Sequence, residues 1–277
     1  MNLAGLPPLR QVIAQHRLSA RRGLGQHFLL DLNLTERIAR AAEISRDHTV
    51  IEIGPGPGGL TRALLATEAR EVIAVERDER CVAALADLVA VSAGRLRVLT
   101  ADAMATDIAA LGRTPRRIVA NLPYNAATAM LVRWLETPAA VDQFTILLQQ
   151  EVAARLTAAP GNKSYGRLSV LVQWLCEARR LFDIGPRAFT PPPKVTSTLV
   201  EIVPRTAPLA AAPREALQAV AAAAFGQRRK MLRSSLRSLS PAAEDILAAA
   251  GIDPRLRAEE VDIAGFCALA RAYADNV

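Results

Sequence analysis

The feature that most constrains the fold is a repeated alternation of short apolar runs with longer helix-compatible segments. The runs are rich in β-branched residues and span 49–53, 71–76, 96–100, 117–120 and 144–148. Segments with helical character separate them at 60–66, 80–91 and 128–135. Parallel strands need crossover connections, and the crossover helices cover both faces of the sheet. The pattern therefore predicts an α/β fold with a doubly wound, mostly parallel sheet.

The pattern changes after Gln150, where the sequence becomes more helical. We expect a helix at 151–156, a loop at 161–166 and apolar runs at 168–175 and 198–203, of which the last is a closing strand. A stretch rich in proline and alanine at 204–213 indicates a linker. Ser240 and Pro241 fit the N-cap and first residue of a helix that Gly251 ends. The sequence predicts a first domain at 1–208 and a small helical domain at 209–277.

Residue types and their spacing exclude several classes of protein. With 51% hydrophobic and 22% charged residues, the chain has the composition of a globular protein rather than a disordered one. No run of eighteen apolar residues occurs, so we expect no membrane segment. The three histidines are scattered, which predicts no metal site. Three widely spaced cysteines predict buried thiols in a reducing compartment; they are Cys81, Cys176 and Cys267.

The net charge of +7 is concentrated in two segments without acidic residues. One lies in the first thirty residues and includes Arg21 and Arg22, a pattern that is also typical of a mitochondrial transit peptide. The other, at 226–239, contains Arg228, Arg229, Lys230, Arg233 and Arg237. Such segments favour a polyanionic partner, because each cation at a phosphate releases condensed counterions. A solvated charged face is the equally weighted alternative for a single run.

A glycine-rich loop follows the first predicted strand, in the stretch Ile51-Glu52-Ile53-Gly54-Pro55-Gly56-Pro57-Gly58-Gly59. Glycines at a strand-to-helix turn let the backbone approach a ligand that a Cβ would obstruct, so we expect a nucleotide site here. Gly54, Gly56 and Gly59 match the dinucleotide spacing, while Gly54, Gly56 and Gly58 match the methyltransferase spacing. The loop alone does not decide between them.

Three acidic residues lie at or near the ends of successive predicted strands. Glu76 has the position to accept hydrogen bonds from two ribose hydroxyls, a role shared by NAD and S-adenosylmethionine enzymes. Asp102 could accept from the amino group of a bound adenine. Glu52 would place a carboxylate near the amino-acid end of a sulfonium ligand, where a pyrophosphate would be repelled. Together they favour S-adenosylmethionine at the carboxyl edge of the sheet, although each acid could also be a solvated strand end.

Asn121-Leu122-Pro123-Tyr124 follows the fourth strand and would face the same edge. An adenine amino nitrogen is a poor nucleophile, because its lone pair is delocalised into the ring. The side-chain oxygen of Asn121 and the carbonyl of Leu122 could accept from its two N–H bonds, with Pro123 setting the turn between them. Tyr124 would then stack on a base held out of its helix, and Phe189 is the candidate for a second wall. The alternative is an ordinary turn with a packed tyrosine.

Several motifs together resemble the KsgA-type small-subunit ribosomal RNA adenine dimethyltransferases over nearly the whole chain. The matching stretches are Gly25-Gln26-His27-Phe28-Leu29, Glu52-Ile53-Gly54-Pro55-Gly56, Asp102-Ala103-Met104, Asn121-Leu122-Pro123-Tyr124-Asn125, Tyr165-Gly166-Arg167-Leu168-Ser169, Phe189-Thr190-Pro191-Pro192-Pro193-Lys194-Val195 and Gln227-Arg228-Arg229-Lys230. Two positions depart from the family pattern, since His27 and Gly226 stand where asparagine is usual. The N-terminal arm is also similar to that of the family, which argues against a cleaved transit peptide.

The resemblance implies a Rossmann-like, S-adenosylmethionine-dependent enzyme acting on two adjacent adenosines of a 3′-terminal hairpin loop in small-subunit ribosomal RNA. It also implies a cytoplasmic monomer that works on an assembling small ribosomal subunit. By the same resemblance, the donor-binding positions are His27, Leu29, Gly54, Glu76, Asp102 and Asn121, to which the residues themselves add Glu52 and Gly56. If 226–239 is helical, Arg229, Arg233 and Arg237 form one stripe suited to an RNA backbone.

Three rival functions remain open on the sequence. A large-subunit ribosomal RNA adenine methyltransferase of the antibiotic-resistance type would share the donor site and the Asn-Leu-Pro-Tyr kind of motif. A ribosome-assembly or mitochondrial transcription factor could keep the same scaffold without relying on its chemistry. An NAD-dependent dehydrogenase is the most distant of the three.

Overall fold

The computed structural model describes residue 3 and residues 5–18 and 26–276 of the 277-residue chain. Internal contacts group the chain into two compact units, Met1–Gln150 with Arg179–Pro204 and Glu151–Ala178 with Arg205–Val277. The second unit thus includes a segment that the sequence analysis assigns to the first domain. The division into domains at residues 208 and 209 stays a prediction, and the two units are described separately.

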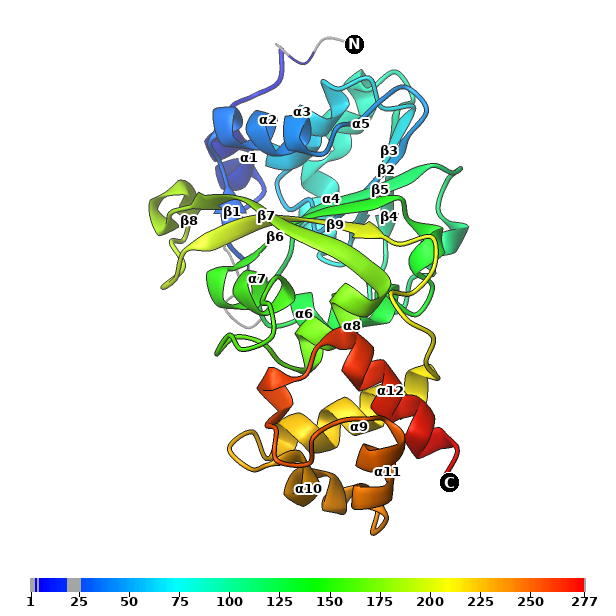
Figure 1. The fold of residues 1–277 in the computed structure, drawn as a ribbon. Helices are drawn as coiled ribbons and strands as arrows, with labels where there is room; N and C mark the ends of the chain where they lie inside the picture. Colours follow the sequence, from blue (N-terminus) through cyan, green and yellow to red (C-terminus); the bar gives the residue numbers. More distant parts are fainter. Residues whose placement is uncertain (1–2, 4, 19–25, 277) are drawn as a thin grey trace. The chain divides into compact units, whose positions relative to one another are not determined.

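A seven-stranded sheet in the order β4-β3-β2-β5-β6-β9-β7 forms the centre of the first unit (Figure 1). Five strands run parallel: β2 (Thr49–Ile53), β3 (Glu71–Glu76), β4 (Leu96–Thr100), β5 (Arg116–Asn121) and β6 (Gln143–Gln149). β9 (Ser197–Pro204) pairs antiparallel with β6 and is followed in the sheet by β7 (Cys176–Ile184). The predicted doubly wound α/β fold, its five strands and the closing strand are confirmed.

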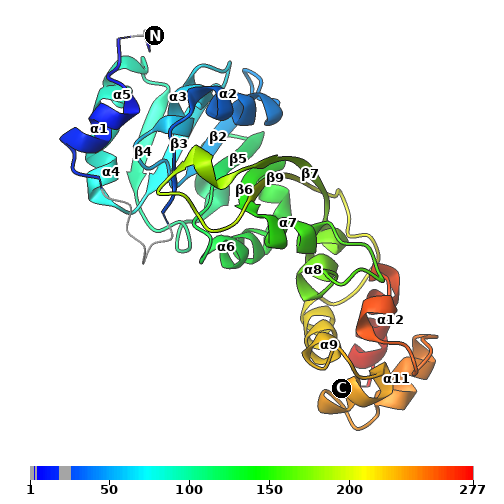
Figure 2. The ribbon, with the colours of Figure 1, turned by 90° about the vertical axis from the view of Figure 1, so that its left-hand side faces the viewer.

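Helices cover both faces of this sheet. The first unit contains α1 (Leu9–Gln15), α2 (Leu32–Ala41), α3 (Gly59–Leu65), α4 (Glu79–Ala84), α5 (Ala86–Val91) and α6 (Ala127–Trp134). α2 and α3 lie on one side of the strands and α6 on the other (Figures 1 and 2). The helix-compatible segment at 80–91 is helical, and it is divided into two short helices at Leu85.

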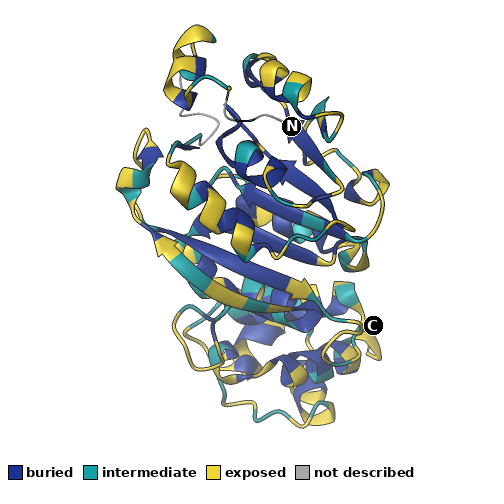
Figure 3. Cartoon of the chain, turned by 90° about the horizontal axis from the view of Figure 1, so that it is seen from above, coloured by how far each residue is buried: buried dark blue, intermediate teal, exposed yellow. Residues whose placement is uncertain are grey.

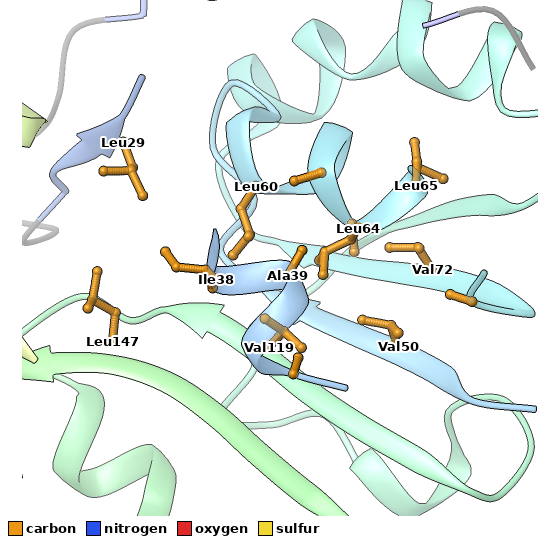
Figure 4. Packing of buried hydrophobic residues seen from close by; sticks show 14 of the residues in the cluster. Leu29, Ile38, Ala39, Val50, Leu60, Leu64, Leu65, Val72, Val119 and Leu147 are labelled. Carbon is orange, nitrogen blue, oxygen red and sulfur yellow. The ribbon is translucent and has the colours of Figure 1, made fainter. Parts of the chain in front are cut away.

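The core between α2, α3 and the sheet explains why the strands read as uninterrupted apolar runs. Val50, Val72 and Val119 point from adjacent strands toward Leu60 and Leu64 of α3 (Figure 4). Every residue of β2 is buried, and the central strands are dark in the burial view (Figure 3). On the opposite face, the Trp134 ring of α6 stacks on Phe144 of β6 with centroids 6.1 Å apart. Strands buried on both faces need apolar side chains at every position.

A second, two-stranded sheet joins distant parts of the first unit. β1 (Phe28–Leu29) pairs antiparallel with β8 (Phe189–Thr190), so that Leu29 lies opposite Phe189. Leu29 and Phe189 are 5% and 3% exposed and belong to the same buried cluster as α3. This pairing holds the segment before α2 against the proline-rich segment that follows Phe189.

The second unit is helical and comprises α7 (Gln150–Leu156), α8 (Arg167–Leu175), α9 (Arg214–Gly226), α10 (Leu232–Ser235), α11 (Ala243–Ala249) and α12 (Ile263–Ala274). Its core includes an aromatic series in which Phe225 contacts both Tyr165 and Phe266, at centroid distances of 5.8 and 5.4 Å. The apolar run at 168–175 forms α8. Gly251 ends α11 at φ +67°, as predicted, but that helix begins at Ala243 rather than at Pro241.

The basic segment at 226–239 is not one helix. α9 ends at Gly226, a turn follows, and α10 continues into a 3₁₀ turn at Leu236–Ser238. The predicted stripe of Arg229, Arg233 and Arg237 was therefore wrong, because Arg229 lies before α10 and outside its helical repeat. An isolated β-bridge between Met231 and Arg257 holds the start of α10 instead.

The three cysteines are buried, as expected for small apolar core residues. In the ranges that the structure describes, His, Cys, Asp and Glu side chains form no group of three suited to a metal ion. Within those same ranges, every helix is too short or too polar to span a lipid bilayer.

Candidate active site

A cleft opens at the carboxyl edge of the parallel strands, where the loops after β2, β3, β4 and β5 meet the segment 26–29. It encloses about 1090 Å³ of atom-free space, counted out to its open mouth. The structure brings together every predicted donor-site and reacting-centre residue in its lining: His27, Leu29, Glu52, Gly54, Gly56, Glu76, Asp102, Asn121, Leu122, Pro123 and Tyr124.

The glycine loop forms the floor of the cleft. Gly54 and Gly56 adopt φ angles of +69° and +56°, a region that residues with a Cβ rarely occupy. A Cβ built on Gly54 would meet no atom within 4 Å, so at this cleft-lining position it would take up ligand space. A Cβ on Gly56 would lie 3.2 Å from the Phe28 ring. Glycine at these positions therefore serves both the turn and the room above it.

Glu76, at the end of β3, is tied to the glycine loop. Its Oε2 accepts a hydrogen bond from the Gly56 amide at 3.2 Å, and its Oε1 accepts from the Arg77 and Asp78 amides at 2.8 and 2.9 Å. Burial raises the pKa of this carboxyl, and the three amide donors partly oppose that rise. Each carboxylate oxygen has two lone pairs, so Glu76 keeps acceptor capacity toward the cleft.

Glu52 is the most unusual charge in the cleft. Its side chain is 1% exposed, and its Oε2 has no hydrogen-bond partner among the described residues. The pKa of Glu52 is raised to about 8, chiefly by burial and to a smaller extent by the neighbouring Glu76 charge. The nearby Thr61 hydroxyl lowers the pKa in part, although it lacks hydrogen-bond geometry to any described residue. A buried carboxyl without a partner is poised to ionise when a cation arrives.

Asp102 lies at the rim, after β4. Its Oδ1 accepts from the Met104 amide at 2.8 Å, and its Oδ2 lies 3.8 Å from the Arg77 guanidinium. The side chain is 48% exposed, so its outer oxygen can still accept a hydrogen bond from a ligand. Arg77 also lines the cleft and was missed by sequence reasoning, because a single arginine after a strand carries no distinguishing pattern.

Asn121 is the last residue of β5 and its amide has a defined orientation. The amide nitrogen donates to the His27 carbonyl at 2.9 Å, because a carbonyl can only accept. Oδ1 is therefore the atom of this side chain that can accept a hydrogen bond. Three residues later, the Tyr124 hydroxyl and the Ser197 hydroxyl are 2.5 Å apart, and burial raises the pKa of Tyr124. Ser197 was missed by sequence reasoning, since 73 residues separate it from Tyr124.

Some predicted substrate-binding residues lie elsewhere. Phe189 is 3% exposed within the core cluster and is not among the residues that line the cleft. Arg21 and Arg22 fall outside the described residues. In the second unit, Arg228 is paired with Glu259 at 2.8 Å and also donates to the Asn162 carbonyl at 3.3 Å. Arg229, Lys230 and Arg233 are exposed, and none forms an ion pair with a described residue.

Comparison with known proteins gives one consistent result. Residues 17–275 match the family described as ribosomal RNA adenine dimethylase. The chain is 62% identical to the ribosomal RNA small subunit methyltransferase A of Rhodospirillum rubrum, over 97% of this chain and 93% of that protein. It is 60% identical to the protein of the same name from Paramagnetospirillum magneticum, over 98% and 96% of the two chains.

Solved structures agree with the fold. The 23S rRNA methyltransferase ErmE is 27% identical, with a TM-score of 0.68 over 89% of this chain and 99% of that one. A dimethyladenosine transferase from Plasmodium falciparum is 22% identical, with a TM-score of 0.74 over 88% and 96%, a likeness that shows the fold. Both matches cover nearly the whole length of the compared chain. With the family match spanning nearly its whole length, the chain belongs to the ribosomal RNA adenine dimethylase family.

Proposed function

We propose that this protein transfers methyl groups from S-adenosylmethionine to the exocyclic amines of two adjacent adenosines in a 3′-terminal hairpin loop of small-subunit ribosomal RNA. Dimethyladenosine is the proposed product, formed on an assembling small ribosomal subunit by a cytoplasmic monomer. The observation that carries the proposal is the oriented amide of Asn121, a residue that lines the cleft. Its nitrogen donates to the His27 carbonyl, so its Oδ1 is the atom that can accept a hydrogen bond. The relatives named above supply the choice of ribosomal subunit.

The residues of the cleft fit a donor that carries a sulfonium, an amino-acid group, a ribose and an adenine. Glu52 offers a buried, unpaired carboxyl oxygen to the cationic part. Glu76 Oε2 keeps one acceptor lone pair for a ribose hydroxyl, and Asp102 has an exposed oxygen for the adenine amino group. Gly54 leaves the space that the ligand needs. Leu29, Gly56 and the main chain of His27 complete the donor site in this proposal.

The donor supplies an electrophilic methyl group, and the chain supplies the geometry of the acceptor. Asn121 Oδ1 and the Leu122 carbonyl oxygen would accept hydrogen bonds from the two N–H bonds of the target amine. Those bonds favour a pyramidal nitrogen with a localised lone pair, and they strengthen as positive charge develops on that nitrogen. The nitrogen–carbon bond forms as the carbon–sulfur bond breaks, and the amine proton then leaves to solvent. Tyr124 provides a flat surface for the base.

The second unit contributes cations for the RNA backbone. Arg229, Lys230 and Arg233 are exposed without ion pairs to described residues, which suits contacts to phosphates. Arg228 forms an ion pair with Glu259, so its proposed contribution to RNA binding is smaller than that of the three exposed cations. The proposal also includes Arg21 and Arg22 as RNA contacts. Phe189 has no part in it as a base wall, because its ring is buried in the core.

The test is transfer of labelled methyl groups to unmethylated small and large ribosomal subunits in parallel, followed by nucleoside analysis. We expect label only in the small subunit, recovered as dimethyladenosine. Label only in the large subunit would replace the proposal with the rival activity that the likeness to ErmE favours. Binding of small subunits without transfer would instead favour an assembly factor.

A further inference from the structure

Three contacts from different parts of the first unit converge on His27. Its carbonyl accepts the hydrogen bond from the Asn121 amide nitrogen at 2.9 Å. Its ring Nδ1 lies 2.8 Å from the Pro191 carbonyl. Its ring also packs against Tyr124, with centroids 5.3 Å apart and planes tilted by 30°. One residue thus touches both ends of the Asn121–Tyr124 segment and the proline-rich segment after β8.

These contacts determine the orientation of the imidazole. The Pro191 carbonyl has no proton to give, so Nδ1 of His27 must carry the hydrogen and donate it. β1 and β8 hold the backbones on both sides of this bond, because Phe28 pairs with Thr190. The ring is therefore fixed by a hydrogen bond at one end and by the main chain at the other. The imidazole also packs against the Tyr124 ring.

Tyr124 is held at a second point. Its hydroxyl is 2.5 Å from the Ser197 hydroxyl at the start of β9, and Ser197 is fully buried. The ring thus meets His27 at its face and Ser197 at its hydroxyl. Two fixed contacts of this kind oppose both tilting of the phenol and rotation about its Cβ–Cγ bond.

The side chain of His27 does not serve the core. His27 is partly exposed, whereas the next two residues, Phe28 and Leu29, are 8% and 5% exposed and fill the space beneath β1. Removing the imidazole should therefore cost little packing. A partly exposed ring with two specific contacts, beside the segment that faces the cleft, is better explained by positioning than by stability.

We propose that His27 and Ser197 are positioning residues that hold Tyr124, and with it Asn121, in the arrangement required by the acceptor base. This inference rests on the proposed methyl transfer to adenine. The side chain of His27 then acts on the rate of transfer at saturating substrates, and only weakly on donor affinity. Misplacing a reacting group by about 1 Å can reduce a rate by about 100-fold, so small shifts of Tyr124 are enough.

The experiment compares His27→Ala with His27→Phe, which keeps a ring against Tyr124 but loses the bond to Pro191. We expect His27→Ala to lower the single-turnover rate by at least about tenfold, while donor affinity and thermal stability stay close to wild type. His27→Phe should retain more of the rate. Ser197→Ala, Tyr124→Phe and the double variant should all lose the same factor, because each breaks the same hydroxyl pair.

A readout without catalysis completes the test. The ring-flip rate of Tyr124, measured by NMR on the full chain, should increase in His27→Ala, because the imidazole packs against the phenol ring. Unchanged flipping with a wild-type rate would overturn the inference. So would a His27→Ala defect that lies wholly in donor affinity, or additive losses in the hydroxyl-pair variants.

Failure of the proposed function looks different. If wild-type protein methylates only large-subunit RNA, the substrate assignment is wrong, yet the variant ratios can be measured on that acceptor. If neither subunit is methylated, the ring-flip comparison still decides whether His27 holds Tyr124.

Discussion

Replacing Glu52 by glutamine removes the charge of this carboxyl while keeping its shape. In the folded protein its pKa is about 8, against an ordinary value of 4.5, and the chief cause is burial. The folded state therefore binds more protons than the unfolded state between these two pH values, so stability falls as pH rises through the interval. Glu52→Gln has no such group and should not lose this stability.

The size of the effect follows from the two pKa values. Between pH 4.5 and pH 7 the wild-type protein should lose about 3 kcal/mol of stability relative to Glu52→Gln, as an order of magnitude. At pH 7 only about a tenth of Glu52 is ionised in the free protein. A cationic donor that needs the carboxylate must therefore displace nearly one proton at this pH.

Calorimetric titration with S-adenosylmethionine in buffers of different ionisation enthalpy measures that proton. We expect release of roughly 0.9 proton at pH 7 and almost none at pH 9.5, where the carboxyl is already ionised in the free protein. Glu52→Gln should show no release from this site and should bind the donor more weakly above pH 8. Thermal unfolding of the free proteins across the same pH range gives the stability difference.

Two results would refute this reasoning. Release of equal numbers of protons by wild-type protein and Glu52→Gln at pH 7 would show that Glu52 stays neutral beside the donor. Alternatively, the stability of the wild-type protein relative to the variant could remain constant between pH 4.5 and pH 8, which would mean that the carboxyl ionises freely in the folded state.

Three further predictions address other parts of the molecule. Asn121→Ala should cut methyl transfer by at least about 100-fold while leaving donor and RNA affinity within a few-fold of wild type, as measured by single-turnover rates and equilibrium binding; a loss confined to affinity contradicts it. Arg229→Gln and Lys230→Gln should each lower the slope of log affinity against log salt by about 1, whereas Arg228→Gln, which breaks the pair with Glu259, should change the slope less and thermal stability more; equal slopes for all three variants speak against this division. The pKa of His48 is lowered by burial and by the Arg117 charge, so stability should fall as pH drops below about 6.5, and His48→Gln should lose less on acidification in thermal unfolding; identical pH profiles exclude that role for His48.

The sheet could be predicted because its central strands are buried on both faces and therefore mostly apolar. In Thr49–Ile53, which is buried throughout, only Thr49 and Glu52 are polar. β7 escaped prediction for the opposite reason. It lies at the end of the strand order, and Glu177, Arg179 and Arg180 interrupt any apolar pattern. The break at Leu85 and the turn after Gly226 depend on local packing, which helical composition does not reveal.

The candidate site could be predicted as far as topology brings strand ends together. Glu52, Glu76, Asp102 and Asn121 lie at or near the ends of neighbouring parallel strands, and those ends share one edge of the sheet. The contacts among loops could not be predicted in the same way. His27 and Pro191 are 164 residues apart, and no pattern in either local sequence indicates the hydrogen bond between them.

The central claim is that Asn121 and Leu122 accept the hydrogen bonds of a target adenine beside the donor cleft. Its most direct test is an experimental structure of the protein with a non-reactive donor analogue and the unmethylated hairpin RNA. We predict that the target amine donates to Asn121 Oδ1 and to the Leu122 carbonyl, with the base against Tyr124. A complex in which residues 121–124 point away from the base, or in which the base reaches the donor from another side of the cleft, would contradict the claim.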